Sequence, residues 1–493
     1  MPVLQRRAVA LLAAVALTAP ALAAQRNAPS TYAITNAKLV PVSAPVIDKG
    51  TIVIRDGLIV ALGANVAVPA DARVIDGTGL TVYPGLFDAF GSIGLASAAP
   101  AGGGRGAGSG AAVLAALAAP ATPGRGGNGN TADQPRGVEP ELSAAEQVRL
   151  DEDALDGPRS AGIASALTAP SAGIFQGQSA LINLGGATAA AMIVRPNVAQ
   201  HIGFSSGRGF GGGGGYPGSL MGVFAVLRQE LLDAQRYRDL KAAYAKNAKN
   251  MQRVEFDPSL EALLPALAGQ QPVVMVANQQ REIERALDLA KEFGLRVMIA
   301  GGAEAHLLAS RLKAENVPVL LSINFPRRTV APIADADPEP LRTLRERVDA
   351  PKSAARLAAA GVKFAFQSGG ITTWSEFDAN IQRAVEGGLA ADQAIKALTW
   401  QPAELFGVSD RLGSLEVGKI ANLTVTKGDL TDKAMRINQL FVDGRPIALH
   451  PPTPAGGAGG FGGGRAGGPP GAAAPPPGGH DPLSPLTNRE SPE

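Results

Sequence analysis

The fold is decided by one stretch of the chain, Val82-Tyr83-Pro84-Gly85-Leu86-Phe87-Asp88-Ala89-Phe90-Gly91-Ser92-Ile93-Gly94-Leu95. Its apolar residues form a short run bounded by turn-forming residues, which predicts a buried strand followed by an opening loop. Residues two apart on a strand point the same way. We therefore expect Phe90 and Ser92 to face one side, at the end of this strand.

Downstream of this stretch, helical and strand patterns alternate. From Arg281 to Phe293, the apolar residues recur with the spacing of one helix face. The same reasoning predicts helices over 303–315 and over part of 340–360, and strands over 295–300, 317–322 and 362–366. Such alternation is typical of a parallel sheet with helices on its faces. Taken alone, it fits both a doubly wound sheet and a barrel.

The sequence pattern predicts short β segments at both ends of the chain. Asp56-Gly57 lies between two apolar runs, and Asp443-Gly444 lies between two others. Asp-Gly in this setting predicts a two-residue hairpin, because a type I′ turn needs a positive φ at both residues. Neither segment is large enough to form a core alone.

These patterns resemble the amidohydrolase superfamily, and in particular the imidazolonepropionase-like amidohydrolases. The opening stretch resembles the family pattern PGLIDAHxHxG, 387–408 resembles GLxxxxALxxxTxxPAxxLG, and Leu412–Val425 resembles GSLEVGKxADLVV. The resemblance covers residues 31–450 and is weak over 96–250. It implies an α/β fold, a (β/α)8 TIM-like barrel rather than a doubly wound sheet, plus a small β-sandwich domain formed by the N- and C-terminal segments.

The expected domain boundaries follow from these patterns. We expect a signal peptide over 1–24, the first part of the β-sandwich over 31–82, the barrel over 83–411, the second part of the β-sandwich over 412–450 and a disordered Pro/Gly-rich tail over 451–493. The barrel region contains a Gly/Ala-rich insert at 96–137 and a glycine loop at 205–218. The inserts and the tail cannot bury enough apolar surface to offset their ordering entropy. The first insert, 96–137, has two interpretations: a disordered surface insertion or a lid over the barrel mouth.

The resemblance implies a site that uses zinc or another divalent metal, held by residues at the ends of barrel strands. In this chain the corresponding positions are substituted, and they read Phe90, Ser92, Val276, Gly301 and Gly369. A hydrolytic zinc site needs about three protein ligands. Without the metal, no bound water reaches a pKa near 7. The sequence therefore predicts that the chain carries no metal cofactor.

A few polar residues remain as candidates for a cleft at the strand ends: His201, Ser92, Asn278, Glu304 and Ser368. Each of these residues could also have a structural role, since a lone histidine is commonly structural and polar residues are common at barrel mouths. A Ser-His-acid triad that uses Ser92 or Ser368 with His201 is geometrically conceivable, but no nucleophile-elbow sequence supports it.

Composition limits the partners and the compartment. The 493 residues carry a formal net charge of +2, which argues against nucleic acid as a partner, and the absence of cysteine excludes thiolate chemistry. Arg6 and Arg7, the apolar run Ala8–Leu17 and the Ala21-Leu22-Ala23 site predict a secretory signal, with an uncleaved anchor as the alternative. We expect a periplasmic or secreted bacterial protein with no membrane span after signal cleavage.

By family, the chain is expected to hydrolyse non-peptide C–N bonds, but the substituted positions predict a metal-free protein that is hydrolytically inactive. It would act as a binding protein for a small molecule in the barrel mouth, as a homodimer, or in a hetero-oligomer with an intact paralogue. The alternative is an active amidohydrolase for a cyclic amide or dipeptide with a non-standard site. Whether the chain is an enzyme stays open at this point.

Overall fold

The computed structural model describes residues 31–95, 137–204, 217–328, 339–371 and 373–449. The predicted signal peptide, the tail and nearly all of both glycine-rich inserts lie outside the described residues. Within the described ranges, no helix combines the length and the apolar character that a membrane span requires.

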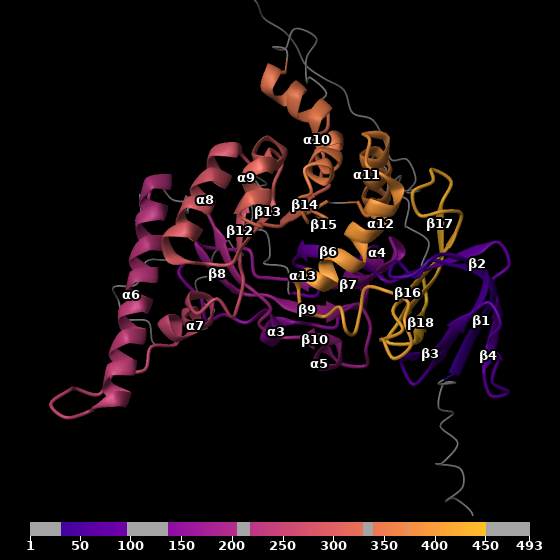
Figure 1. Ribbon diagram of the computed structural model, residues 1–493, viewed down its shortest axis with the longest axis horizontal. Coiled ribbons are helices and arrows are strands. Elements are labelled where there is room, and N and C mark those ends of the chain that lie inside the picture. Colours follow the sequence, from indigo (N-terminus) through magenta and orange to yellow (C-terminus); the bar gives the residue numbers. More distant parts are fainter. Residues whose placement is uncertain (1–30, 96–136, 205–216, 329–338, 372, 450–493) are drawn as a thin grey trace, which may run out of the picture. The chain divides into compact units, whose positions relative to one another are not determined.

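The two ends of the chain share one sheet (Figure 1). Its strands are β1 Thr31–Leu39, β2 Ile47–Arg55, β3 Leu58–Gly63, β4 Arg73–Asp76, β5 Leu80–Pro84, β16 Leu423–Lys427, β17 Arg436–Val442 and β18 Arg445–Ile447. The order is β18-β17-β16-β5-β1-β2-β3, with β4 paired to β1. The antiparallel pairing of β5 with β16 joins the ends, as the sequence predicts.

Both predicted hairpin turns adopt the expected backbone. Asp56 and Gly57 have φ of 51° and 86°, and Asp443 and Gly444 have φ of 50° and 71°. The first turn joins β2 to β3 and the second joins β17 to β18. The Asp-Gly signal was therefore sufficient to locate both hairpins.

The barrel is built mainly from parallel strands. They are β6 Leu86–Gly91, β7 Ile163–Thr168, β11 Gln200–Gly203, β12 Val273–Ala277, β13 Val297–Gly301, β14 Val319–Ser322 and β15 Phe364–Gln367. β6 pairs with β7, and β11 through β15 pair in sequence order. β15 lies beside β6, which closes the ring.

The remaining position in the ring breaks the parallel pattern. β8 Phe175–Gln178 runs antiparallel to β11, and β9 Ala180–Asn183 runs antiparallel to β7. Ser179 connects them and exchanges backbone hydrogen bonds with residues 198 and 199, so β8 and β9 act as one strand that bridges the two sheets. β10 Ile193–Arg195 adds to the outer edge of β9.

Helices follow most of the strands and cover the barrel. They are α3 Ala144–Gln147, α4 Glu152–Ser160, α5 Ala189–Met192, α6 Leu220–Lys246, α7 Pro258–Leu267, α8 Gln280–Phe293, the 3-10 helix η2 Ala305–Leu308, α9 Ala309–Ala314, α10 Leu341–Ala359, α11 Ser375–Glu386, α12 Ala391–Leu398 and α13 Trp400–Leu405. The helix expected at 303–315 is divided into η2 and α9, while the strands and the other helices expected after Arg281 are present.

The three largest apolar clusters among the described residues follow from this architecture. One fills the space between the barrel and its helices, the second fills the barrel interior with residues such as Phe87, Val274, Met298 and Leu320, and the third lies within the terminal sheet. Along β12, β13, β14 and β15, alternate residues belong to the first two clusters, as the two-residue period of a strand requires.

Candidate functional site

The five positions that the family resemblance assigns to metal ligands lie at one end of the barrel. Phe90 lies at the end of β6 with Ser92 just beyond it, Val276 lies near the end of β12, Gly301 ends β13, and Gly369 follows β15. The carboxyl ends of parallel barrel strands meet on one face, where the sites of such barrels are built. The structure therefore brings these five positions to the barrel mouth.

At two of these positions, neighbouring side chains occupy the space that a ligand side chain would need. A Cβ added at Gly301 would overlap Asn278 Oδ1, and a Cβ added at Gly369 would overlap Ser322 Oγ. Both glycines are in the left-handed region, with φ of 95° and 63°, which disfavours any residue with a side chain. Both glycines thus lie in tight contact with side chains from neighbouring strand ends.

His201 lies inside the barrel beneath Phe90. Its side chain is 0% exposed, and its ring stacks on the Phe90 ring at a centroid distance of 5.2 Å. Among the described residues, neither ring nitrogen has a hydrogen-bond partner. Burial lowers the pKa of His201 to about 3, so the ring is neutral and donates no proton at ordinary pH.

Ser368 is joined to Asp88, a residue that the sequence analysis did not single out. Both are buried, and Asp88 accepts hydrogen bonds from Ser368 N at 2.8 Å and from Ser368 Oγ at 2.7 Å. Burial raises the pKa of Asp88 to about 6, against the opposing effect of these hydrogen bonds. Asp88 could have been identified in the sequence because it is a lone aspartate within an apolar strand. The pair ties β6 to the end of β15.

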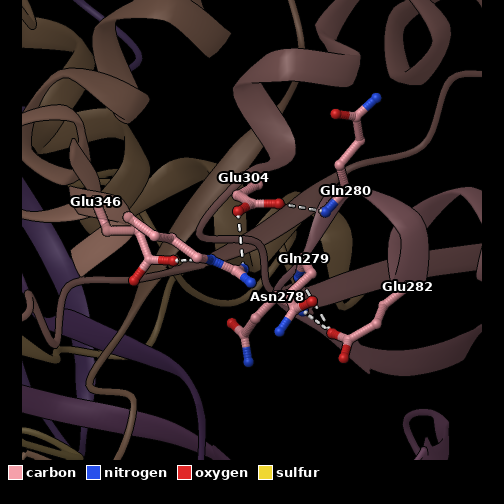
Figure 2. A network of polar contacts seen from close by, with 7 residues as sticks. Asn278, Gln279, Gln280, Glu282, Glu304 and Glu346 are labelled. Atoms are coloured by element: carbon pink, nitrogen blue, oxygen red, sulfur yellow. Dashed lines mark hydrogen bonds and ion pairs between the residues drawn. The ribbon is translucent and has the colours of Figure 1, made fainter. Parts of the chain in front are cut away.

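Glu304 and Asn278 lie at the mouth ends of β13 and β12, but their polar groups serve the local structure (Figure 2). Glu304 Oε2 accepts a hydrogen bond from Gln280 N at 2.7 Å, and Glu304 Oε1 pairs with Arg342 Nη2 at 3.1 Å. The backbone of Asn278 accepts from Glu304 N and donates to Glu282. The carboxylates therefore satisfy backbone donors at the start of α8.

The Ser-His-acid hypothesis finds no support in this geometry. Ser92 is exposed beyond β6, whereas His201 is enclosed and Ser368 Oγ is directed at Asp88. Because the ring nitrogens of His201 have no partner among the described residues, the structure does not bring this histidine into a hydrogen bond with either serine.

The side chains at the five positions do not fit a divalent metal. They offer a phenyl ring, one neutral hydroxyl, an isopropyl group and two hydrogen atoms, whereas zinc is bound by imidazole, thiolate or carboxylate. Across the described ranges, no group of three or more His, Cys, Asp or Glu side chains is arranged to hold a metal ion.

Comparison with known proteins relates this architecture to a family. The model of the amidohydrolase family matches residues 215–447. An adenine deaminase from Moorella thermoacetica is 41% identical over 68 residues, which is 14% of this chain and 11% of the deaminase. That match is therefore limited to a small part of the deaminase and carries no whole-protein activity.

Solved structures extend the likeness to most of the fold. An amidohydrolase from Thermotoga maritima MSB8 matches with a TM-score of 0.67 and 24% identity, covering 85% of this chain and 100% of that one. A prolidase solved with N-methylphosphonate-L-proline matches with a TM-score of 0.50 and 16% identity, again covering 85% and 100%. At these identities the structures show a shared fold. The match of the family model relates residues 215–447, just under half of the chain, to the amidohydrolase family.

Proposed function

We propose that this chain is an exported, non-hydrolytic member of its superfamily that uses no divalent metal and acts as a binding protein or as the partner subunit of an active paralogue. The observation that carries the proposal is the occupation of the mouth by Asn278 and Ser322. These side chains stand where residues at Gly301 and Gly369 would otherwise project.

The remaining polar groups of the mouth support the same conclusion. Hydrolysis through a metal-bound water needs a metal to lower the pKa of that water. The Asp88 and Glu304 carboxylates already accept hydrogen bonds within the fold, and His201 is enclosed. The mouth therefore lacks both a metal donor set and a free, accessible general base among these candidates.

Retention of the whole barrel supports a role that depends on its surface. The strands, the helices and the sheet shared by the two chain ends all persist although the family's ligand positions are lost. Fold and site chemistry are separable. A small molecule at the mouth or an intact copy of the barrel would use the fold without the reaction. The secretory signal predicted from Arg6, Arg7 and the apolar run Ala8–Leu17 supports a role in the periplasm or outside the cell.

The first test is the metal content of the mature chain, purified without chelators, incubated with zinc or manganese, desalted and analysed by elemental mass spectrometry. We expect far less than one ion per chain, and no chelator-sensitive release of product from cyclic amides or dipeptides. An amount near one ion per chain would overturn the proposal. Chelator-insensitive turnover would instead favour an active enzyme with a non-standard site.

The partner role has its own test. The chain carrying an affinity tag is co-expressed with a paralogue that retains the His-x-His motif, and the mass of the purified species is measured by light scattering. A stable mixed oligomer is expected if the chain is a partner subunit. Separate species at micromolar concentration would reject that role and leave the binding role.

A further inference from the structure

A cavity lies at the opposite end of the barrel from the mouth. It has a volume of about 850 Å³ and is lined by the turns that precede β13, β14 and β15, together with the end of α13. This volume falls within the range of small-molecule sites, about 300–1,000 Å³. The N-terminal face of such barrels is associated with stability rather than catalysis, so the mouth chemistry does not account for this cavity.

The cavity has an apolar interior. Its lining includes the partly exposed Pro272, Pro318 and Leu405, together with the buried Leu287 and Leu312. An apolar cavity of this kind gains free energy by covering an apolar group of a ligand, because that surface leaves water. The interior therefore favours a ligand with a compact apolar body.

The rim carries an excess of positive charge. Lys291, Arg296, Lys313 and Lys363 line the cavity, against the two carboxylates Glu315 and Glu404. Both carboxylates are already paired, Glu404 with Lys363 at 2.8 Å and Glu315 with Arg311 at 2.9 Å.

Three of these cations have no carboxylate partner. Arg296 donates to the backbone oxygen of Gly269, while Lys291 and Lys313 take part in no ion pair among the described residues. Lys291 and Lys313 lie in the last turns of α8 and α9, where the helix dipole favours a cation. The helix dipole explains why basic residues occur at these two positions. It does not explain why both lysines line a cavity with an apolar interior.

We propose that this cavity binds a small organic anion: a carboxylate attached to an apolar ring or branched chain. The apolar body would cover Pro318 and Leu405, and the carboxylate would meet Lys291 and Lys313 at the rim. Charge-assisted hydrogen bonds of ammonium to carboxylate are stronger than neutral ones, so the charge of the ligand is the feature that the rim selects. The inference goes beyond the proposed function and does not depend on it, since it concerns the other end of the barrel.

The test compares two probes that share one apolar body, 2-naphthoate and 2-naphthamide, by isothermal titration of the full-length mature protein at low salt. We expect the acid to bind about tenfold more tightly than the amide, or better. Replacing both rim lysines (Lys291→Met with Lys313→Met) should remove this preference. The matched control is Lys246→Met, which removes an exposed lysine from the last turn of α6 and should leave both affinities unchanged.

Each other outcome overturns the proposal: equal binding of acid and amide, no binding of either at millimolar concentration, or a preference that persists in the double variant. Circular dichroism of the variants shows that they are folded. Metal found in the barrel mouth would overturn the proposed function while leaving this titration unaffected, so the two failures are distinguishable.

Discussion

At the scale of single residues, His201 is the clearest case of a polar side chain held against its solvation preference. A buried imidazole without partners loses its hydrogen bonds to water and gains none in return. Stacking on Phe90 gives contact area but does not satisfy either nitrogen. Burial of His201 in the barrel interior therefore lowers the free energy of unfolding by an amount that depends on pH.

His201→Leu should stabilise the fold, and more so in acid. The folded pKa of about 3 lies below the unfolded value of 6.5, so the unfolded chain binds the extra proton as the pH falls below 6.5. Wild type should therefore lose about 2 kcal/mol of unfolding free energy between pH 7.5 and pH 5 through this residue, and the variant should not. Urea unfolding at both pH values measures the difference.

The comparison variant is His306→Gln, because His306 is half-buried and its Nδ1 lies 3.3 Å from Ser353 Oγ. Burial also lowers the pKa of His306, so this variant should show a pH effect of the same sign. A difference between His201→Leu and wild type that is the same at both pH values would show that His201 is accessible to protons in the folded state.

Asp88 has the opposite pH dependence. Its folded pKa of about 6 lies above the unfolded value of 3.8, so the folded state binds the extra proton and stability falls as the pH rises from about 4 to above 6. Asp88→Asn should remove this decline, which amounts to about 2 kcal/mol between pH 4.5 and pH 7. Thermal unfolding at pH 4.5 and pH 7 tests it, with Asp392→Asn on the surface of α12 as the control. Parallel pH profiles for Asp88→Asn and wild type would contradict the assignment.

At the scale of elements, the loop after β15 separates two reasons why a glycine is required. Gly369 and Gly370 have φ of 63° and 71°, so alanine is strained at both. A Cβ at Gly369 would overlap Ser322 Oγ, whereas a Cβ at Gly370 would have nothing within 4 Å. The second position is therefore a matched control for the first.

Gly369→Ala should destabilise the protein by about 1–3 kcal/mol more than Gly370→Ala, since overpacking adds to backbone strain. Urea unfolding of both variants measures this difference. Adding Ser322→Gly to Gly369→Ala should recover most of the extra loss. Equal losses at the two glycines would mean that Ser322 moves aside without cost, and that the mouth is not closed at this position.

The elements show what local sequence can and cannot predict. The Asp56-Gly57 turn and α8 were predictable because their signals, a dipeptide and a helical period, lie within the element itself. The strand formed by β8 and β9 was not predicted, because its two halves are fixed by different neighbours. Short apolar runs carry no information about such distant pairing.

The candidate site also combines features that local sequence predicts with features that depend on distant parts of the chain. The positions Gly301 and Gly369 could be located by pattern, because the spacing from strand to loop is local. That Asn278 and Ser322 fill the adjacent space could not be found in the sequence, because it depends on how neighbouring strands are placed. The Asp88–Ser368 pair, 280 residues apart in the chain, belongs to the same class.

At the scale of the whole molecule, a buried polar network joins the terminal sheet to the barrel. Asn422, just before β16, donates to Ser165 Oγ in β7 at 3.0 Å and to Asn183 Oδ1 in β9 at 2.9 Å. Its own Oδ1 accepts from Asp443 N at 2.8 Å, and Asn183 donates to Asp443 Oδ1 at 2.6 Å. The network thus links residues between 165 and 443 of the chain.

Asn422→Ala should therefore weaken the attachment of the terminal sheet to the barrel as well as the local packing. The change removes the acceptor of Asp443 N and one of the two hydrogen bonds to Asn183 Oδ1, which still accepts from Ser165 Oγ. A buried donor left without a partner costs about 1–3 kcal/mol. Chemical denaturation followed by fluorescence and circular dichroism should show a loss of this size. Gln229→Ala, which removes an exposed amide from α6, is the control and should change stability little. If Asn422→Ala were as stable as this control, the network would contribute nothing to joining the two ends of the chain to the barrel, and the pairing of β5 with β16 would have to hold them alone.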